Sequence, residues 1–454
     1  MCGIAGLHRP GLPFPESVSG VASMLAAMHH RGPDARGLHE VDGGALGAVR
    51  LAVIDLHGGD QPLFNEDRSV VVVFNGEIYN HPELFRRLRR NGHQLSSRAD
   101  SEVIAHLYED LGVRGLVAEL DGMFAFALWD ARRQRLHLVR DRFGVKPLHW
   151  TWDGTTLAFA SEVKAMAAAG VVRPRLDMDA WTELLTFQNI LSDRSLFDGV
   201  RLLPPGSVLT LDAEGPRVDR FWDAYPCPDP SLRAGPELEE AVRDHFEAGV
   251  RRQLVADVEV AAYLSGGLDT GSVAAVAAAS LPRLTTFATG FDLSIATGME
   301  ATFDERSDAR QLAGTLGTHH KELLLDQADL PMILPRLVRA IEEPRLSFSY
   351  PNYLTAGMAS RWVKVVLSGA GGDEVFGGYP WRYESAARPD WQAGYFEWWQ
   401  RLLTPASMSE LLTDEARSQV DLDRPRRVFN EILDRVDGAA PLDAMLYLEF
   451  TTYL

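Results

Sequence analysis

The chain has 454 residues, 46% of them hydrophobic and 24% charged, which is typical of a globular protein with two or three domains. Its net charge of −18 argues against a protein that binds nucleic-acid backbones, because such proteins need a concentrated basic surface. Two cysteines, Cys2 and Cys227, are too few for a disulfide framework, so we expect a reducing cytoplasm. Apolar runs are far shorter than the roughly 20 residues of a membrane helix, so no membrane association is expected.

The first 165 residues predict strands interrupted by short helices. Apolar runs end at turn residues, and Asn75-Gly76 and Asp153-Gly154 are typical hairpin signals. The predicted strands are 70–74, 123–129, 136–139 and 157–160, and the predicted helices are 17–29, 82–91 and 101–111. This pattern favours an α+β domain with extensive sheet.

The chain becomes rich in loops from about residue 170, and a proline-rich linker follows near residues 225–236. Beyond it, helices alternate with apolar strands, a pattern typical of a parallel sheet with crossover helices. The predicted helices are 236–254, 270–280 and 306–316, and the predicted strands are 258–264, 284–289 and 362–367. We therefore expect two domains, 1–225 and 226–454.

Cys2 follows the initiator methionine directly. If Met1 is removed, one residue carries both a thiol and an α-amine whose reference pKa is about 7.7 to 8.0, so the amine can act as the thiol's own general base. Position alone favours a plain buried cysteine in a first strand.

Seven segments change this balance, because together they resemble the class II glutamine amidotransferases. The segments are Met1–Gly6, His30–Asp34, Arg50–Asp55, Gln61–Leu63, Phe74–Asn80, Asp100–Glu102 and Arg140–Leu148. The resemblance implies an N-terminal-nucleophile (Ntn) hydrolase sandwich of antiparallel sheets with Cys2 as the nucleophile. It also implies that the Asn75 amide and the Gly76 N–H stabilise the oxyanion that forms during amide hydrolysis.

The same resemblance assigns the glutamine-binding residues. Arg50 suits the α-carboxylate of glutamine, and Glu77 and Asp100 suit its α-ammonium. Arg31 and Asp34 are expected in a loop over the pocket. Taken singly, Arg50 or Asp100 would be interpreted as an ordinary surface charge.

A glycine-rich turn, Ser265–Thr270, lies between a predicted strand and a predicted helix. It is not a Walker A loop, yet its backbone N–H groups and the helix N-terminus suit phosphate, and Asp269 calls for a bridging Mg²⁺. It resembles the signature loop of the ATP pyrophosphatases (adenine nucleotide α-hydrolase type), as does Leu367–Tyr379. The resemblance implies ATP binding by Leu264, Ser265, Gly266, Gly267, Asp269, Thr270, Thr289, Ser368 and Gly369, with metal held by Asp269 and Asp373.

Two further segments of the second domain resemble the family. Residues 287–290 are expected to border adenine, and the stretch from Phe303 to His320 also follows the family. His319 and His320 are expected to be structural, because further ligands at usable spacing are missing from the sequence.

A class II glutaminase followed by this domain resembles the asparagine synthetase B family along essentially all of the chain. The resemblance implies glutamine hydrolysis, ATP-dependent adenylation of a carboxylate (aspartate by default), release of AMP and pyrophosphate, and a possible homodimer. Family members usually extend further, so we expect the synthetase domain to be incomplete at its C-terminus.

Several alternatives stay open. Ala370 stands where relatives often have Glu, and Ser347 and Phe348 also depart from the usual pattern, so another carboxylate in natural-product biosynthesis is the runner-up. A non-catalytic amidotransferase-like binding protein is disfavoured because Cys2, Asn75 and the paired aspartates are retained together. A phosphoribosyl-pyrophosphate amidotransferase should carry an acidic pair before a Gly-Thr phosphoribosyl loop, a motif that this sequence lacks, whereas the Ser-Gly-Gly-Leu-Asp loop is present. β-Lactam-forming synthetases keep the adenylating domain but lack the nucleophile, so Cys2 disfavours them.

Overall fold

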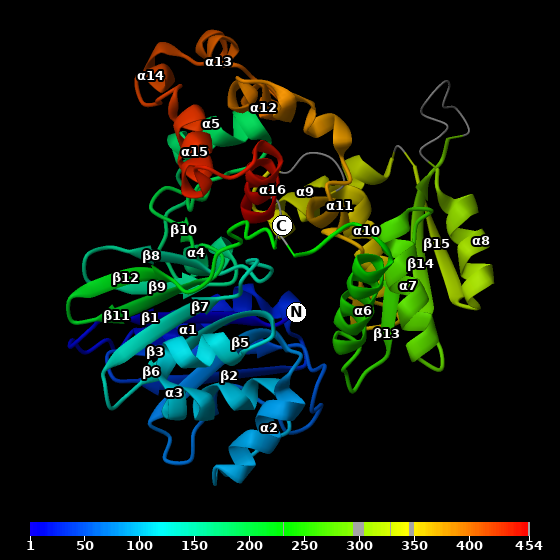
Figure 1. Cartoon of the computed structure of the whole chain (residues 1–454). Coiled ribbons are helices and arrows are strands. Elements are labelled where there is room, and N and C mark those ends of the chain that lie inside the picture. Colours follow the sequence, from blue (N-terminus) through cyan, green and yellow to red (C-terminus); the bar gives the residue numbers. More distant parts are fainter. Residues whose placement is uncertain (230, 294–303, 327, 345–348, 453–454) are drawn as a thin grey trace. The chain divides into compact units, whose positions relative to one another are not determined.

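The computed structural model describes residues 1–229, 231–293, 304–326, 328–344 and 349–452 (Figure 1). The chain divides into two compact units, Met1–Pro226 with Pro380–Leu454, and Cys227–Tyr379. The predicted domains differ from this division at residues 380–454, which pack with the first unit. Within the described residues, no helix is both long and apolar enough to cross a membrane.

Two antiparallel sheets of six strands form the centre of the first unit. The first has the order β10 (Arg201–Leu202), β8 (His149–Trp152), β9 (Leu157–Ala160), β1 (Gly3–His8), β3 (Gly44–Arg50) and β2 (Ala35–Val41). The second has the order β12 (Gly215–Arg220), β11 (Ser207–Asp212), β7 (Arg135–Arg140), β6 (Gly122–Asp130), β5 (Val70–Ile78) and β4 (Leu63–Phe64).

Alternation along the strands builds a sandwich of four layers, helices, sheet, sheet and helices, with hydrophobic core between them. In β5, Val71 and Val73 pack with Ile4 of β1 in the layer between the sheets, whereas Val70 and Val72 pack against helices. Helices α2 (His81–Arg90) and α3 (Val103–Glu119) cover the second sheet, and α1 (Ser17–Ala27) and α4 (Val163–Ala168) cover the first. The expected antiparallel sandwich is confirmed.

One local prediction is wrong. Asn75-Gly76 is not a turn, because β5 runs from Val70 to Ile78 and both residues pair with β6. In the register of this pair of strands, Asn75 lies opposite Ala125 and Gly76 lies opposite Phe124. Tertiary pairing therefore overrides the local preference of Asn-Gly for a hairpin turn.

The last 75 or so residues add a helical layer to the first unit. They contain α12 (Trp391–Trp399), α13 (Pro405–Leu411), α14 (Asp414–Arg417), α15 (Arg424–Leu433) and α16 (Pro441–Thr452). Phe396 and Phe429 contact Phe187 of α5 (Met178–Phe187) with ring centroids 5.9 and 6.3 Å apart, and Arg424 pairs with the buried Glu183 at 3.1 Å. An aromatic core with a buried ion pair thus attaches this layer to α5.

The second unit is a parallel sheet with the order β15 (His319–Leu325), β14 (Thr285–Phe291), β13 (Val260–Tyr263) and β16 (Val365–Leu367). Its helices are α6 (Pro236–Arg252), α7 (Leu268–Ser280), α8 (Arg306–Leu316), α9 (Asp329–Ile341), α10 (Ser349–Ala359) and α11 (Gly372–Phe376). The predicted parallel α/β sheet is confirmed, and β15 is a strand that the sequence did not predict.

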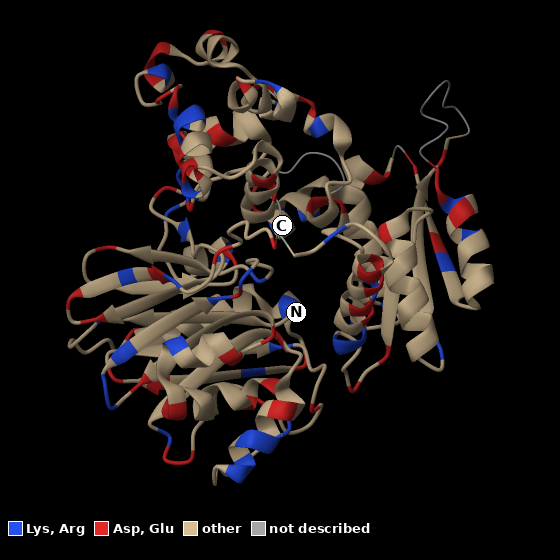
Figure 2. Ribbon diagram, viewed as in Figure 1, with Lys and Arg blue, Asp and Glu red and all other residues tan. Residues whose placement is uncertain are grey.

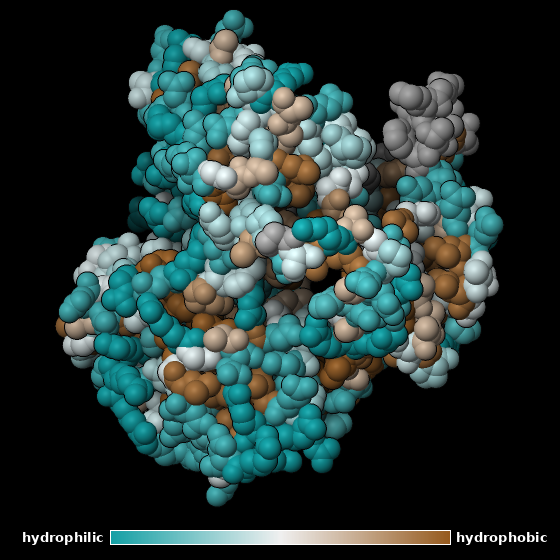
Figure 3. Space-filling model, in the orientation of Figure 1, coloured by the Kyte–Doolittle hydropathy of each residue, from teal (hydrophilic) through white to brown (hydrophobic). Residues whose placement is uncertain are grey.

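The surface carries charged residues of both signs, as expected from the composition. Figure 2 shows basic residues gathered on α2, which carries Arg86, Arg87, Arg89 and Arg90. The face drawn in Figure 3 is largely hydrophilic, with scattered apolar groups. The exposed apolar side chains of the second unit include Leu268, Met332 and Phe376.

Candidate active sites

Cys2 directly precedes β1, and alternation places it on the same face of that strand as Ile4, towards the second sheet. Its Sγ accepts the Leu51 N–H at 3.4 Å. Burial raises the pKa of the thiol, and the charges of Glu77 and Asp100 raise it further. The thiol is therefore neutral at rest, and a nearby base must remove its proton before it can attack.

The N-terminal amine has the properties of such a base. Burial, with contributions from the charges of Arg31 and Lys146, lowers the pKa of the Met1 amine to about 6. An amine in this position is unprotonated at neutral pH. Removal of Met1 would move the free amine onto Cys2 itself.

Asn75 and Glu77 continue the inward face of β5 that begins with Val71 and Val73. The Asn75 side chain is fully buried (0% exposed), and neither its Nδ2 nor its Oδ1 has a hydrogen-bond partner. An unpaired buried amide costs free energy, so it is notable beside the strand that carries Cys2. The amide is suited to donate to a ligand oxyanion.

Gly76 is fixed by close approach of the neighbouring strand. A Cβ at this position would lie 2.2 Å from the Met123 carbonyl oxygen and 2.7 Å from Phe124 Cα. Any larger residue would therefore separate β5 from β6. The glycine is required by packing, whatever its N–H contributes to catalysis.

Arg50, Glu77 and Asp100 form one electrostatic group, since the guanidinium charge acts on both carboxyls. The buried guanidinium of Arg50 donates to the carbonyls of Ile54 (2.9 Å) and Asp55 (2.6 Å), and to Asp60 (3.3 Å). These acceptors account for three of its five N–H donors.

The pKa values of the two carboxyls are both raised above their ordinary values. Burial raises the pKa of Glu77 to about 9, assisted by the charge of Asp100. Burial also raises the pKa of Asp100, whose Oδ2 accepts the Ile78 N–H at 2.7 Å. An ammonium group beside this pair of buried acids would stabilise their ionised forms, while the guanidinium suits a carboxylate. This combination is the chemistry expected of a site for an α-amino acid.

Arg31 and Asp34 make hydrogen bonds to the segments around Cys2. Arg31 Nε donates to the Cys2 carbonyl at 2.9 Å, and its Nη1 pairs with Glu162 at 3.0 Å. Asp34 Oδ2 accepts the Ala52 N–H at 2.8 Å. Both side chains therefore hold the segments on either side of Cys2 and Leu51.

Lys146 is a residue of this site to which the sequence interpretation gave no role. It is 5% exposed, and burial lowers its pKa, while the charges of Glu77 and Cys2 act on it in the opposite direction. The residue lies inside the Arg140–Leu148 segment, so the family resemblance included Lys146 but did not assign it a function. A buried ammonium here stabilises negative charge on either neighbour.

In the second unit, the strand order reverses between β13 and β16, which makes this the topological switch point of the sheet. Ligands of open α/β sheets bind at such points, outside the carboxyl ends of the strands. The turn that begins at Ser265 follows β13, and the turn that begins at Ser368 follows β16. The two glycine-rich loops, about 100 residues apart in sequence, therefore meet where a nucleotide would bind.

A cavity of about 820 Å³ opens beside these loops. Of the sequence-predicted ATP-binding residues, Leu264, Ser265, Thr270 and Thr289 line it, together with Phe287 and Ala288 of the predicted adenine border. Its lining does not include Gly266, Gly267, Asp269, Ser368 or Gly369. The first loop is pre-ordered, since Gly266 N–H donates to Glu305 (3.2 Å) and the Ser265 and Thr270 hydroxyls lie 2.9 Å apart.

Asp269 and Asp373 lie close together. The charge of Asp373, second to burial, raises the pKa of Asp269. Gly372 leaves room for the carboxylate, because a Cβ there would lie 2.3 Å from Asp269 Oδ2. Two converging carboxylates fit a hard divalent cation such as Mg²⁺, which would neutralise their repulsion and bind phosphate oxygens.

His319 and His320 begin β15, and the Nδ1 of His320 lies 3.0 Å from the Thr286 hydroxyl. Ser347 and Phe348, which depart from the family pattern, lie outside the described residues, as does Phe303.

Two family models define the class of protein, a glutamine amidotransferase domain followed by an asparagine synthase domain. Residues 1–222 match the family model of the glutamine amidotransferase domain, and residues 241–454 match that of asparagine synthase. A glutamine phosphoribosylpyrophosphate amidotransferase from B. subtilis, solved with ADP and GMP, is 17% identical with a TM-score of 0.37, over 71% of this chain and 65% of that one.

Curated relatives then define the family. "Asparagine synthetase [glutamine-hydrolyzing] 3" of Bacillus subtilis (strain 168) is 30% identical over 93% of this chain and 69% of its own length. "Asparagine synthetase [glutamine-hydrolyzing] 2" of Oryza sativa subsp. japonica is 35% identical over 84% of this chain and 60% of its own length. The chain thus spans only part of the length of these relatives. It belongs to the glutamine-hydrolysing asparagine synthetase family.

Proposed function

We propose that this chain catalyses the ATP-dependent, glutamine-hydrolysing amidation of a carboxylate. Aspartate is the default acceptor, with asparagine, AMP and pyrophosphate as products. The observation that carries the proposal is the unpaired buried amide of Asn75, which lies two residues from Glu77 on the inward face of β5. Family membership supports the second half of the reaction.

In the glutaminase step, Cys2 Sγ attacks the side-chain carbonyl carbon of glutamine. The α-amine of Cys2, free after removal of Met1, takes the thiol proton and returns it to the departing ammonia. Asn75 Nδ2 and the Gly76 N–H donate to the oxyanion, while Arg50 binds the α-carboxylate and Glu77 with Asp100 binds the α-ammonium. Water then cleaves the thioester and releases glutamate.

In the synthetase step, the loops after β13 and β16 hold the triphosphate, with the base in the adjoining cavity. The carboxylate displaces pyrophosphate to form an acyl-adenylate, and ammonia displaces AMP. Asp269 and Asp373 would hold Mg²⁺, which would neutralise phosphate charge. Glutamine, ATP and the acceptor are thus the proposed ligands.

The acceptor is the least constrained part of the proposal. Ala370 is exposed in the second loop, where its N–H donates to Ser368 Oγ at 3.2 Å. Its methyl group supplies no charge and leaves room for a larger acid. A different carboxylate in natural-product biosynthesis is therefore the second candidate. We also propose a homodimer, on family grounds, and a cytoplasmic setting, because both cysteines are free.

The nucleophile assignment is tested with Cys2→Ala. The variant should release no glutamate from glutamine, yet still release pyrophosphate when ammonium is supplied with Mg-ATP and acceptor. N-terminal mass analysis of the parent should show loss of Met1. Persistent glutamine hydrolysis in the variant would overturn the assignment.

A second experiment identifies the acceptor. Pyrophosphate release is measured over a panel of carboxylic acids with ammonium and Mg-ATP. Turnover with aspartate supports the default, whereas turnover with another acid and none with aspartate selects the second candidate.

A further inference from the structure

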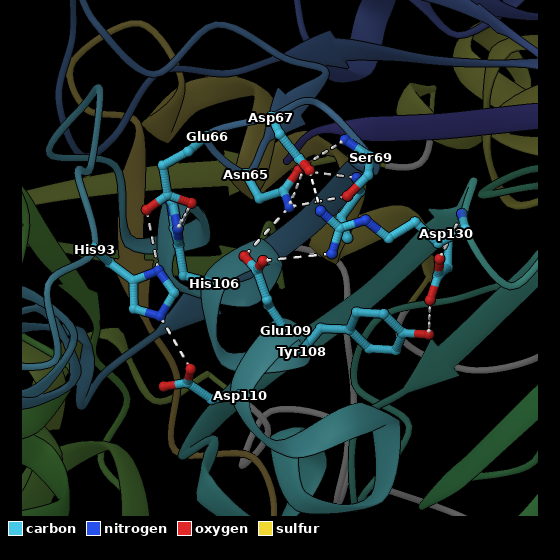
Figure 4. Close-up of polar contacts among 12 residues, drawn as sticks. Asn65, Glu66, Asp67, Ser69, His93, His106, Tyr108, Glu109, Asp110 and Asp130 are labelled. Atoms are coloured by element: carbon cyan, nitrogen blue, oxygen red, sulfur yellow. Dashed lines mark hydrogen bonds and ion pairs between the residues drawn. The ribbon is translucent and has the colours of Figure 1, made fainter.

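A cluster of imidazoles and carboxylates lies outside both candidate active sites, beside α2 and α3 (Figure 4). Glu66 follows β4, His93 follows α2, and His106 lies within α3. One ligand atom from each lies within 4.8 Å of the others, so these three described residues form a group that could hold a metal ion. From these three residues we infer a binding site for Zn²⁺ or a similar borderline transition-metal ion.

The Glu66 carboxylate lies close enough to both imidazoles for all three side chains to share one ion. The two carboxylate oxygens of Glu66 lie 3.0 Å from His93 Nδ1 and 3.2 Å from His106 Nδ1. Donors about 2.0 to 2.1 Å from a tetrahedral zinc lie roughly 3.3 Å apart. The two separations from Glu66 are near this value, and the three ligand atoms, which lie within 4.8 Å of one another, would have to draw together around an ion.

The buried histidine supplies an independent observation. His106 is 1% exposed, and neither of its ring nitrogens makes a hydrogen bond of acceptable geometry, although carboxylate oxygens lie 3.2 and 3.6 Å away. A buried imidazole without a well-made hydrogen bond is uncommon. Coordination of a metal ion by its Nδ1 lone pair would satisfy it.

His93 also has a partner of the kind that orients a metal ligand, and a carboxylate lies near the other ring nitrogen of His106. His93 Nε2 lies 3.1 Å from Asp110 Oδ1, and His106 Nε2 lies 3.6 Å from Glu102 Oε1. A ligating imidazole commonly donates its other N–H to a carboxylate, which fixes its tautomer and orientation. The Asp110 carboxylate has this role towards His93, whereas Glu102 lies near His106 Nε2 without a hydrogen bond to it.

The carboxylates are themselves held in place. Glu66 Oε1 accepts the Gln94 N–H at 2.9 Å, and Asp110 Oδ2 accepts from Asn91 at 3.2 Å. Glu102 accepts from Ser96 and Ser97, each at 2.8 Å. Two imidazoles and one carboxylate favour zinc over Mg²⁺ or Ca²⁺, which prefer oxygen ligands alone.

The position of the cluster indicates what a bound ion would do. It would join the turn after β4 and the segment after α2 to α3. Glu102 also holds Ser96 and Ser97, which lie four and three residues before Asp100. Zinc would therefore restrain residues 91–102. Glu66 is exposed, so the ion can reach the site from solvent, and water can fill a fourth position.

The test uses the full, tag-free chain stripped with a chelator and titrated with Zn²⁺ against a competing chromophoric chelator. We expect one high-affinity equivalent per chain, strongly weakened in Glu66→Gln and His93→Gln, and weakened about 10- to 100-fold in Asp110→Asn. Cys2→Ser and the exposed His245→Gln are controls that should keep the equivalent. Co²⁺ should give the intense d–d absorption of a four-coordinate ion.

Hydrogen exchange supplies a readout independent of activity. Zn²⁺ should slow exchange in residues 91–102 of the parent but should not slow it in Glu66→Gln. Because Glu66 is exposed, this substitution should leave the fold intact, so a lost response to Zn²⁺ would not be due to misfolding. The inference is overturned if no equivalent is retained, or if Glu66→Gln and His93→Gln bind zinc as tightly as the parent. Circular dichroism confirms that each variant is folded.

Discussion

Removal of the Asn75 amide should separate catalysis from stability. In Asn75→Ala, the oxyanion loses its side-chain donor, and loss of one such donor lowers kcat by about 10²- to 10³-fold. The amide is fully buried and unpaired in the folded protein, so its removal recovers about 1 to 3 kcal/mol of desolvation cost. The small void left behind costs about 1 kcal/mol. The variant should therefore be as stable as the parent, or slightly more stable.

Asn65→Ala is a matched control. This side chain is also buried, but its Nδ2 donates to Asp67, Ser69 and Glu109 at 3.0 to 3.2 Å, and its Oδ1 accepts the Val70 N–H at 2.9 Å. The same substitution there should lower the free energy of unfolding by about 1 to 3 kcal/mol. Glutaminase kcat should change little, because Asn65 lies outside the proposed site.

The assay pairs glutamate release at saturating glutamine with urea unfolding of both variants. A parent-like kcat in Asn75→Ala would refute the oxyanion role. If Asn75→Ala lost as much stability as Asn65→Ala, its amide would have to be hydrogen-bonded in the folded protein, and the physical argument for the site would be wrong.

Three other substitutions give separate tests. The folded-state pKa of Glu77, about 9, exceeds its unfolded value, so the folded protein holds the extra proton and loses stability as the pH rises towards 9. Glu77→Gln should reduce this loss between pH 5.5 and 8 in urea unfolding, and equal slopes in both proteins would contradict the assignment. Gly76→Ala should destabilise by about 1 to 3 kcal/mol because its Cβ meets the Met123 carbonyl, whereas Gly249→Ala, with open space around it, should not. Asp269→Asn should abolish pyrophosphate release and keep glutaminase activity; loss of both would instead indicate misfolding.

The sequence predicted most elements of the first unit because hydrophobic alternation is strong there. Val70 to Phe74 identifies a buried strand, but the polar pair Asn75-Gly76 suggests its end. In the structure the strand continues to Ile78, since pairing with β6 satisfies the backbone of both residues. Asn75 and Gly76 therefore lie in regular sheet, which the local turn preference of Asn-Gly did not predict.

The second unit shows the opposite limitation. β15 contains the charged residues Lys321 and Glu322 and lies at the edge of the sheet, so its sequence lacks the apolar run of a central strand. Local pattern also gave no reason for residues 380–454 to pack with the first unit, because that packing depends on contacts of α12 and α15 with the distant α5.

Spatial convergence is what a single sequence could not provide. Alternating strands and helices predict a parallel sheet, yet they do not give the order β15-β14-β13-β16 that brings Asp269 and Asp373 together. The sequence likewise did not show that Glu66, His93 and His106 lie together, because their segments resemble ordinary polar loops and a helix, and only the fold brings them close to one another. For the first pair, a resemblance to a family motif was the reason to consider the two aspartates together. For the imidazole cluster no motif existed, because its three residues come from three segments with no common spacing, so only the structure could reveal it.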